Sequence, residues 1–211
     1  NLQAAVRLGV VDRYDTDPAC AVVGADVVVV AVPLGAMAAV LRSIVPHLAP
    51  DAIVTDVGSA KGSVVADVAR IYGDIPPCFV PGHPIAGTEN SGVEASFATL
   101  FQRRRVILTP LAETAATAHH LIQQMWELTG AEVVDMGVHH HDAVLAATSH
   151  LPHLLAYTLV DTLARLDDRA EIFRYAAGGF RDFTRIASSD PTMWRDICVA
   201  NREQLLEMIA L

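Results

Sequence analysis

The chain has 211 residues, of which 52% are hydrophobic and 18% charged, and its formal net charge at pH 7 is -9. This length allows one large domain or two small ones, and the low charged fraction with a mean hydropathy of +0.35 excludes an intrinsically disordered chain. The acidic balance argues against nucleic acid as a partner, because binding a phosphate backbone needs a basic surface.

Cysteine usage and the apolar runs bear on the compartment. Cys20, Cys78 and Cys198 are odd in number and widely spaced, which fits neither a disulfide framework nor a zinc finger. The longest apolar runs, such as residues 27–32, are too short to span a bilayer, and the first residues do not resemble a signal segment. We therefore expect a cytoplasmic protein without a membrane partner.

Strand and helix patterns alternate over the first two thirds of the sequence. Residues 26–33 form a β-branched run closed by proline, which is typical of a strand buried on both faces, and residues 34–45 follow as a helix. Further strands and helices are predicted in turn over residues 52–57, 63–72, 78–81, 105–109, 113–129 and 132–135. This alternation predicts an α/β fold with a doubly wound sheet.

Helical periodicity replaces the alternation after Gly137. Residues 142–166 form one long predicted helix that contains Pro152. We expect a kink there, because a proline removes one backbone hydrogen bond and clashes with the carbonyl of Thr148.

Two further helices are predicted over residues 171–177 and 191–210, the second capped by Asp190. The chain thus divides into an α/β domain, residues 1–137, and an all-α domain, residues 138–211. Apolar positions surround much of the helical circumference, which predicts a homodimer through residues 142–166 and 191–210.

Polar and flexible residues gather where the predicted strands end. Ligands of open parallel sheets bind at these carboxyl ends, which here carry Val32-Pro33, Gly58-Ser59 and Gly82-His83-Pro84. A Gly-Ser turn lets the backbone approach a ligand and supplies a hydroxyl, and a histidine that titrates near neutral pH suits a general base. A lone loop histidine is more often an ordinary surface residue, but three converging loops favour a site.

The helical half adds histidines and arginines with open alternatives. His150 and His153 face the same way beside Pro152, either as site residues or as core histidines with satisfied hydrogen bonds. Arg181 and Arg185 lie four residues apart; one could clamp a carboxylate, or they could pair with neighbouring aspartates.

A further cluster, residues 139–142 with the sequence His-His-His-Asp, suggests a metal site. Consecutive helical residues point in different directions, however, so they cannot easily share one ion. A cluster at the start of a helix is the preferred interpretation.

Together these segments resemble the prephenate/arogenate dehydrogenase family of tyrosine biosynthesis. The matching segments follow the family's order and spacing over nearly the whole chain, at residues 31–33, 55–61, 82–89, 91–92, 149–153, 178–187 and 189–196. The resemblance implies a Rossmann-type dinucleotide-binding domain followed by a helical dimerisation and substrate domain. It also implies oxidative decarboxylation of prephenate to 4-hydroxyphenylpyruvate, with hydride transfer to NAD, NADP not being excluded.

The resemblance implies roles for individual residues. His83 matches the catalytic histidine that accepts the proton of the ring 4-hydroxyl, Ser59 matches a serine that hydrogen-bonds this histidine or the substrate, and Arg185 matches an arginine on a substrate carboxylate. The other residues implied for the substrate are Ser149, His150, His153, Gly179 and Trp194, and those implied for the cofactor are Val32, Pro33, Gly58 and Ser59. No metal is implied.

One part of the family pattern does not occur in this sequence, the Gly-x-Gly-x-x-Gly motif. The resemblance implies that the first strand, its glycine-rich turn, the phosphate-binding helix and the second strand precede Asn1, with residues 1–8 as the next helix. We therefore expect an N-terminally truncated Rossmann-type domain. In the usual strand order the missing strands lie between residues 27–32 and 53–56, so either the natural protein supplies them or these two strands pair directly with each other. We also expect weak dinucleotide binding and no activity from these residues alone.

Three other functions stay open. Arogenate carries an amine where prephenate has a ketone, and an acidic residue near that end would favour it, whereas His153 is not acidic. A metal-dependent hydrolase could use His83, His150 and His153, although no carboxylate partner is obvious in those segments. A non-catalytic dimeric module is the third.

Overall fold

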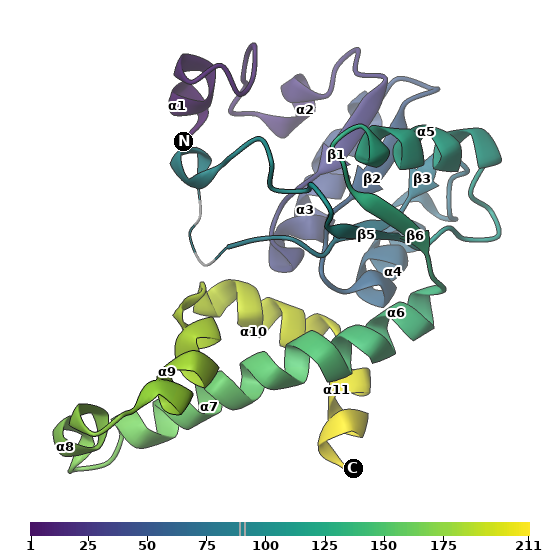
Figure 1. Cartoon of the computed structure of the whole chain (residues 1–211). Coiled ribbons are helices and arrows are strands. Elements are labelled where there is room, and N and C mark those ends of the chain that lie inside the picture. Colours follow the sequence, from purple (N-terminus) through teal and green to yellow (C-terminus); the bar gives the residue numbers. More distant parts are fainter. Residues whose placement is uncertain (89, 91) are drawn as a thin grey trace.

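The computed structural model describes residues 1–88, 90 and 92–211, so Glu89 and Ser91 of the predicted motif lie outside the described residues. Within the described part, six short strands form two three-stranded sheets (Figure 1). The first sheet is parallel, in the order β1 (Val27–Val30), β2 (Ile53–Asp56) and β3 (Phe79–Val80). The second has the order β4 (Gly82–Pro84), β5 (Arg105–Leu108) and β6 (Glu132–Asp135), with β4 antiparallel and β6 parallel to β5.

Helices cover both faces of this sheet system. The helices α3 (Leu34–Ile44) and α4 (Lys61–Tyr72) share one apolar core with β1 and β2, and α5 (Ala116–Glu127) shares a second core with β5. Two short helices, α1 (Leu2–Arg7) and α2 (Pro18–Ala21), precede the first strand. The predicted doubly wound α/β fold is confirmed.

Of the two arrangements expected for the first two strands, the structure has direct pairing. β1 pairs directly with β2 over all four of its residues, from Val27 with Ile53 to Val30 with Asp56. The connecting helix α3 is therefore a crossover between adjacent parallel strands, which is the ordinary βαβ unit. No strand lies between residues 27–32 and 53–56 in the described part of the chain.

His83 lies on a strand rather than on the predicted loop. The strand predicted over residues 78–81 turns at Pro81 and continues as β4, in which His83 faces Ile107 of β5. The first sheet ends before Pro81 because proline has no N–H to donate to a strand ladder. The carbonyl of Pro81 accepts the N–H of Thr109 at 2.9 Å, next to the pairing of β4 with β5.

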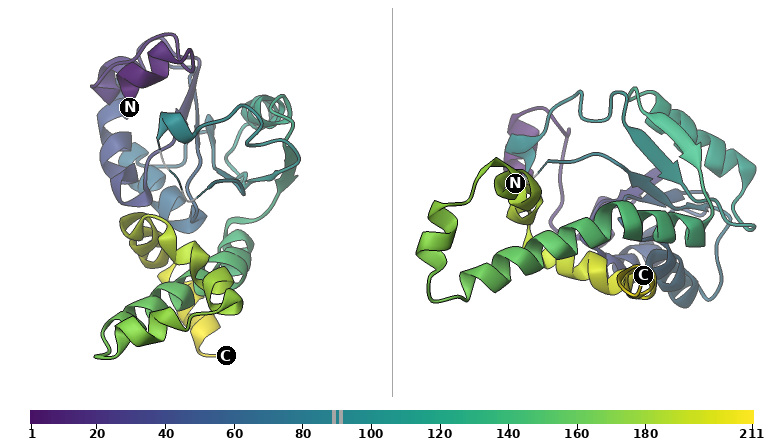
Figure 2. Two further views of the ribbon diagram at one scale, coloured as in Figure 1. Left: turned by 60° about the vertical axis from the view of Figure 1, so that its left-hand side comes forward. Right: turned by 60° about the horizontal axis from the view of Figure 1, so that its bottom comes forward.

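The long helix of the second half is continuous but irregular. The helix α6 (Val138–Leu145) runs through a π-helical turn, Ala146–His150, into α7 (Leu151–Ala164), and Figure 2 shows the three as one long rod. The π turn ends two residues before Pro152, the position at which a kink is expected from the sequence.

The rest of the helical half is more broken than the sequence pattern predicts. It contains α8 (Arg169–Arg174), α9 (Gly178–Thr184), a 3-10 turn (Arg185–Ser188), α10 (Pro191–Ala200) and α11 (Arg202–Ile209). The helix predicted over residues 191–210 is interrupted at Asn201, and α9 was not predicted because its two glycines disfavour a helix. Asp190 accepts the N–H of Met193 at 2.8 Å, as expected for a cap.

Candidate active site

A buried ion pair lies at the carboxyl end of β2. Asp56, the last residue of that strand, and Lys61, the first residue of α4, are 1% and 0% exposed and contact each other through Asp56 Oδ2 and Lys61 Nζ. Lys61 Nζ also donates to the carbonyl of Gly82 at 2.6 Å. Burial lowers the pKa of Lys61, and the carboxylate of Asp56 opposes this change. The pair fixes the backbone immediately before His83.

His83 begins a chain of hydrogen-bonded side chains that crosses into the helical half. Its Nδ1 lies 2.9 Å from Nε2 of His141, and Nδ1 of His141 lies 2.8 Å from Oδ1 of Asp142. Burial, helped by the charge of Lys61 and by the nearby His141 and His150, holds the pKa of His83 well below its ordinary value. His83 is therefore a neutral imidazole at pH 7.

Asp142 joins the two halves of the molecule. Its carboxylate accepts the backbone N–H groups of Lys61 and Gly62, both at 2.8 Å, so a residue of α6 caps the first turn of α4. A Cβ atom at Gly62 would lie 2.9 Å from Oδ2 of Asp142, which explains the glycine there. Burial raises the pKa of Asp142, but the hydrogen bonds from His141, Lys61 and Gly62 outweigh it and lower the pKa.

His150, at the end of the π turn, lies close to the turn that carries Ser59. Asn201 Nδ2 lies 3.0 Å from His150 Nδ1 and donates to the carbonyl of Asp142 at 2.8 Å. Nε2 of His150 makes no well-aligned hydrogen bond to a described residue, yet the backbone of Ser59 lies close enough to raise the pKa of His150. Burial outweighs this effect and lowers the pKa of His150 to about 4. Ser59 and His150 thus lie close together.

A second group of predicted residues gathers around Trp194. The ring of His153 stacks on Trp194 with centroids 3.4 Å apart, and that of His150 meets Trp194 edge-on at 6.3 Å. Nδ1 of His153 lies 2.8 Å from the carbonyl of Ser149, and burial lowers the pKa of His153. The buried Nε1 of Trp194 has no hydrogen-bond partner among the described residues.

The remaining predicted residues lie on two other elements. Val32 and Pro33 connect β1 to α3 at the carboxyl edge of the sheet. Gly179 lies in α9 and Arg185 begins the 3-10 turn that follows, and both elements pack against α7 (Figure 1). Space around Gly179 is open, since nothing lies within 4 Å of a Cβ atom placed there.

Sequence reasoning missed the roles of Lys61, His141, Asp142 and Asn201. Asp56 and Lys61 enclose the Gly-Ser turn directly after a buried strand, which was a usable signal for a buried pair. The argument against residues 139–142 as ligands of one ion does not prevent His141 and Asp142 from serving two different neighbours. Among the described residues, no group of three or more His, Cys, Asp or Glu side chains could hold a metal ion.

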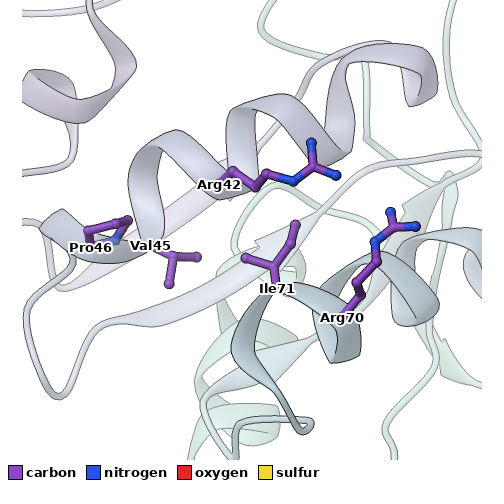
Figure 3. Close-up of a pocket in the computed structure, with 5 residues that line it drawn as sticks. All are labelled: Arg42, Val45, Pro46, Arg70 and Ile71. Atoms are coloured by element: carbon purple, nitrogen blue, oxygen red, sulfur yellow. The ribbon is translucent and has the colours of Figure 1, made fainter.

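A surface pocket of about 310 Å³ lies between α3 and α4, away from this site. It is lined by Arg42, Val45, Pro46, Arg70 and Ile71 (Figure 3). Arg42 and Arg70 lie in the last turns of their helices, at the end opposite to the carboxyl edge of the strands. The pocket shares no residue with the predicted site, and Arg70 is already paired with Asp67.

The fold is that of a Rossmann-like nucleotide-binding domain followed by a helical second domain. Residues 1–135 match the model of the prephenate dehydrogenase nucleotide-binding domain, and residues 138–210 match that of the prephenate dehydrogenase dimerization domain. The chain belongs to the prephenate dehydrogenase family.

Individual relatives agree with this assignment. The chain is 44% identical over 208 residues to the cyclohexadienyl dehydrogenase of Zymomonas mobilis, covering 97% of this chain and 69% of the relative. It is 37% identical to the prephenate dehydrogenase of Bacillus subtilis, covering 97% of this chain and 55% of the relative. The prephenate dehydrogenase of Aquifex aeolicus, solved with hydroxyphenyl propionate and NAD+, superposes with a TM-score of 0.90 at 40% identity, covering 99% of this chain and 73% of that chain.

The buried histidines predict a loss of stability in acid. Because the pKa of His150 falls from 6.5 to about 4 on folding, the unfolded chain binds a proton that the folded chain does not. Its stabilising contribution is present above pH 6.5 and is lost as the pH falls toward 4. We expect the free energy of unfolding in urea to drop by about 2 kcal/mol between pH 7 and pH 5 from His150 alone, with a further loss from His83.

The comparison of pH slopes isolates this contribution. His150→Gln should flatten the loss between pH 7 and pH 5, whereas His120→Gln, on the exposed face of α5, should leave it unchanged. An unaltered slope in His150→Gln would contradict the assignment.

Proposed function

We propose that the protein catalyses the oxidative decarboxylation of prephenate to 4-hydroxyphenylpyruvate with NAD as hydride acceptor, in tyrosine biosynthesis. The observation that carries the proposal is the buried, neutral His83, which lies between the ends of the nucleotide-binding strands and the histidine-rich helix. A base that is unprotonated at pH 7 is what removal of a hydroxyl proton requires.

His83 accepts the proton of the ring 4-hydroxyl as hydride leaves the same carbon. Loss of the ring carboxylate as carbon dioxide then makes the ring aromatic. The hydroxyl of Ser59 hydrogen-bonds either His83 or the substrate hydroxyl. Ser59 itself lies in the turn next to His150. The cofactor supplies the hydride acceptor when it is bound.

The residues at the carboxyl edge fit the nicotinamide end of a dinucleotide. Val32 and Ser59 are half-buried and Pro33 is exposed, so the edge presents apolar groups and one hydroxyl without a charge. A Cβ atom at Gly58 would lie 2.8 Å from Leu34 and 2.9 Å from Asp56, so the backbone of this turn packs closely. NAD is further supported by the NAD+ in the Aquifex aeolicus structure.

Prephenate carries two carboxylates, so an acidic protein needs a local cation to bind it. We assign this role to Arg185, with Ser149, His150, His153, Gly179 and Trp194 lining the rest of the site. We favour prephenate over arogenate as the substrate because His153 is not acidic. By the family resemblance, His153 lies near the end of the substrate where the two compounds differ. Each of these roles is a proposal for this chain, which spans 55% of the Bacillus subtilis relative.

We also propose a cytoplasmic homodimer. The helix Val138–Ala164 is long and apolar enough to cross a membrane by length and composition, and only 22% of its apolar window is buried. His141 and Asp142, in its first turns, are buried against α4 and β4 instead. The uncovered apolar face therefore fits a second copy of the matched dimerization domain.

Turnover tests the reaction. We expect prephenate-dependent formation of NADH and carbon dioxide, and an activity lowered about 100-fold or more in His83→Asn. Both are measured on the 211 residues and on an extended chain, in which Asn1 follows a Rossmann-type strand–turn–helix segment with the glycine motif. Full activity of a folded His83→Asn variant would refute the base.

Arg185→Gln tests the carboxylate clamp. Loss of a charge-assisted contact should raise KM for prephenate about tenfold or more while kcat changes little. Arg174→Gln, on α8, serves as the control and should leave both constants unchanged. An unaltered KM in Arg185→Gln would remove the clamp role from this residue.

The exposed leucines of the helical half test the dimer. Leu155 on α7 and Leu206 on α11 are 50% and 49% exposed, and we expect the double variant Leu155→Asp/Leu206→Asp to be monomeric by light scattering. Leu121→Asp, at a 40% exposed position of α5, should remain dimeric. A monomeric wild-type protein would refute the proposal.

A further inference from the structure

We propose that His141 and Asp142 are positioning residues that fix the tautomer of His83, so that its Nε2 is the unprotonated atom offered to the substrate. The inference rests on the proposed function for the use of that base. The hydrogen-bond arrangement itself stands on geometry within this chain.

The direction of each hydrogen bond follows from Asp142. Its carboxylate already accepts two backbone N–H groups at 2.8 Å, so it is ionised and can only accept. Nδ1 of His141, 2.8 Å from Oδ1 of Asp142, must therefore carry the hydrogen. We take His141 in its neutral form, which has one donor and one acceptor, so Nε2 of His141 is the acceptor.

The same rule sets the state of His83. Its Nδ1 lies 2.9 Å from the acceptor Nε2 of His141, so Nδ1 carries the hydrogen. Nε2 of His83 then has a free lone pair, which is the atom that a general base needs. The opposite tautomer would place two lone pairs against each other between the buried rings of His83 and His141.

Proton transfer leaves this chain of hydrogen bonds intact. When Nε2 of His83 takes the hydroxyl proton, Nδ1 still donates to His141, and the new positive charge is balanced through His141 by the carboxylate of Asp142. No second proton has to move. Two further charged groups lie near His83, Lys61 and its partner Asp56. His150, in the π turn, also faces His83.

Asp142 also makes this arrangement depend on the contact between the halves. The carboxylate that orients His141 is the one that caps α4, and His141 comes from α6 whereas His83 comes from β4. If α6 moved away from α4, His83 would lose the acceptor that selects its tautomer. The base is therefore complete only when the helical half is docked.

Nitrogen-15 NMR of the histidine rings in the 211-residue protein tests the tautomers directly. At pH 7 we expect His83 and His141 both to be protonated at Nδ1 and unprotonated at Nε2. In His141→Phe, His83 should lose this preference, whereas His141→Gln should keep it, because an amide oxygen can accept from Nδ1 of His83. A wild-type His83 protonated at Nε2 overturns the proposal.

Kinetics supply the second readout, in whichever of the two chains turns over prephenate. His141→Phe and Asp142→Asn should lower kcat about 100-fold with KM for prephenate within about twofold, because a positioning residue acts on the base and not on substrate binding. His141→Gln should recover most of kcat, and His140→Gln, exposed beside it, should match the wild type. Equal kcat values in His141→Phe and wild type overturn the role.

The two proposals fail separately. A protein with the expected tautomers but without prephenate turnover in either chain refutes the proposed function and supports the hydrogen-bond chain. A protein that turns over prephenate with His83 protonated at Nε2 supports the proposed function and refutes the hydrogen-bond chain. Thermal unfolding of each variant shows whether a loss of kcat comes from loss of the fold, and His141→Gln keeps the test valid if Asp142→Asn unfolds.

Discussion

Asp56 and Lys61 place opposite charges where β2, α4 and β4 meet, and water reaches neither side chain. Removing one partner would leave an unpaired charge in the interior and lower the free energy of unfolding by about 3–5 kcal/mol. The pair is tolerable because its remaining hydrogen-bonding capacity is used, by the carbonyl of Gly82 and by the N–H of Gly58 at 2.7 Å. The same contacts hold the turn that carries Ser59 and the strand that carries His83. The ion pair of Asp56 and Lys61 therefore sets the positions of both residues.

The helical half completes the site by supplying acidic side chains to helix starts of the α/β half. Asp142 accepts N–H groups at the start of α4, where the helix dipole also favours a negative charge. Asp196 of α10 approaches the start of α3 so closely that a Cβ atom at Gly35 would lie 2.3 Å from its carboxylate oxygen. A chain that folded the first half alone would leave His83 with Lys61 beside it and without His141.

The sequence predicted the parts of the molecule that depend on local pattern. The valine run of β1, the helices that follow β1 and β2 and the cap at Asp190 were all recognisable, because periodicity and capping act over a few residues. The choice between a gap and direct pairing of β1 with β2 could not be made this way. The strand at His83 could not be predicted either, since both features depend on partners distant in the chain. The contacts of His141 and Asp142 with β4 and α4 join residues 58 and 81 positions apart and leave no local pattern.

The electrostatics of the base combine two opposing influences. Burial and the neighbouring Lys61 disfavour the protonated form of His83, which keeps the lone pair available at neutral pH. The same influences would make the imidazolium formed during proton transfer costly if nothing compensated them. Asp142 supplies the compensation at the distance of one intervening ring, near enough to stabilise the charge that develops. It lies too far to hold a proton on His83 beforehand, because His141 separates the two groups. A base of low pKa can therefore remain effective, since the carboxylate acts on the reaction through the hydrogen bond that also selects the tautomer.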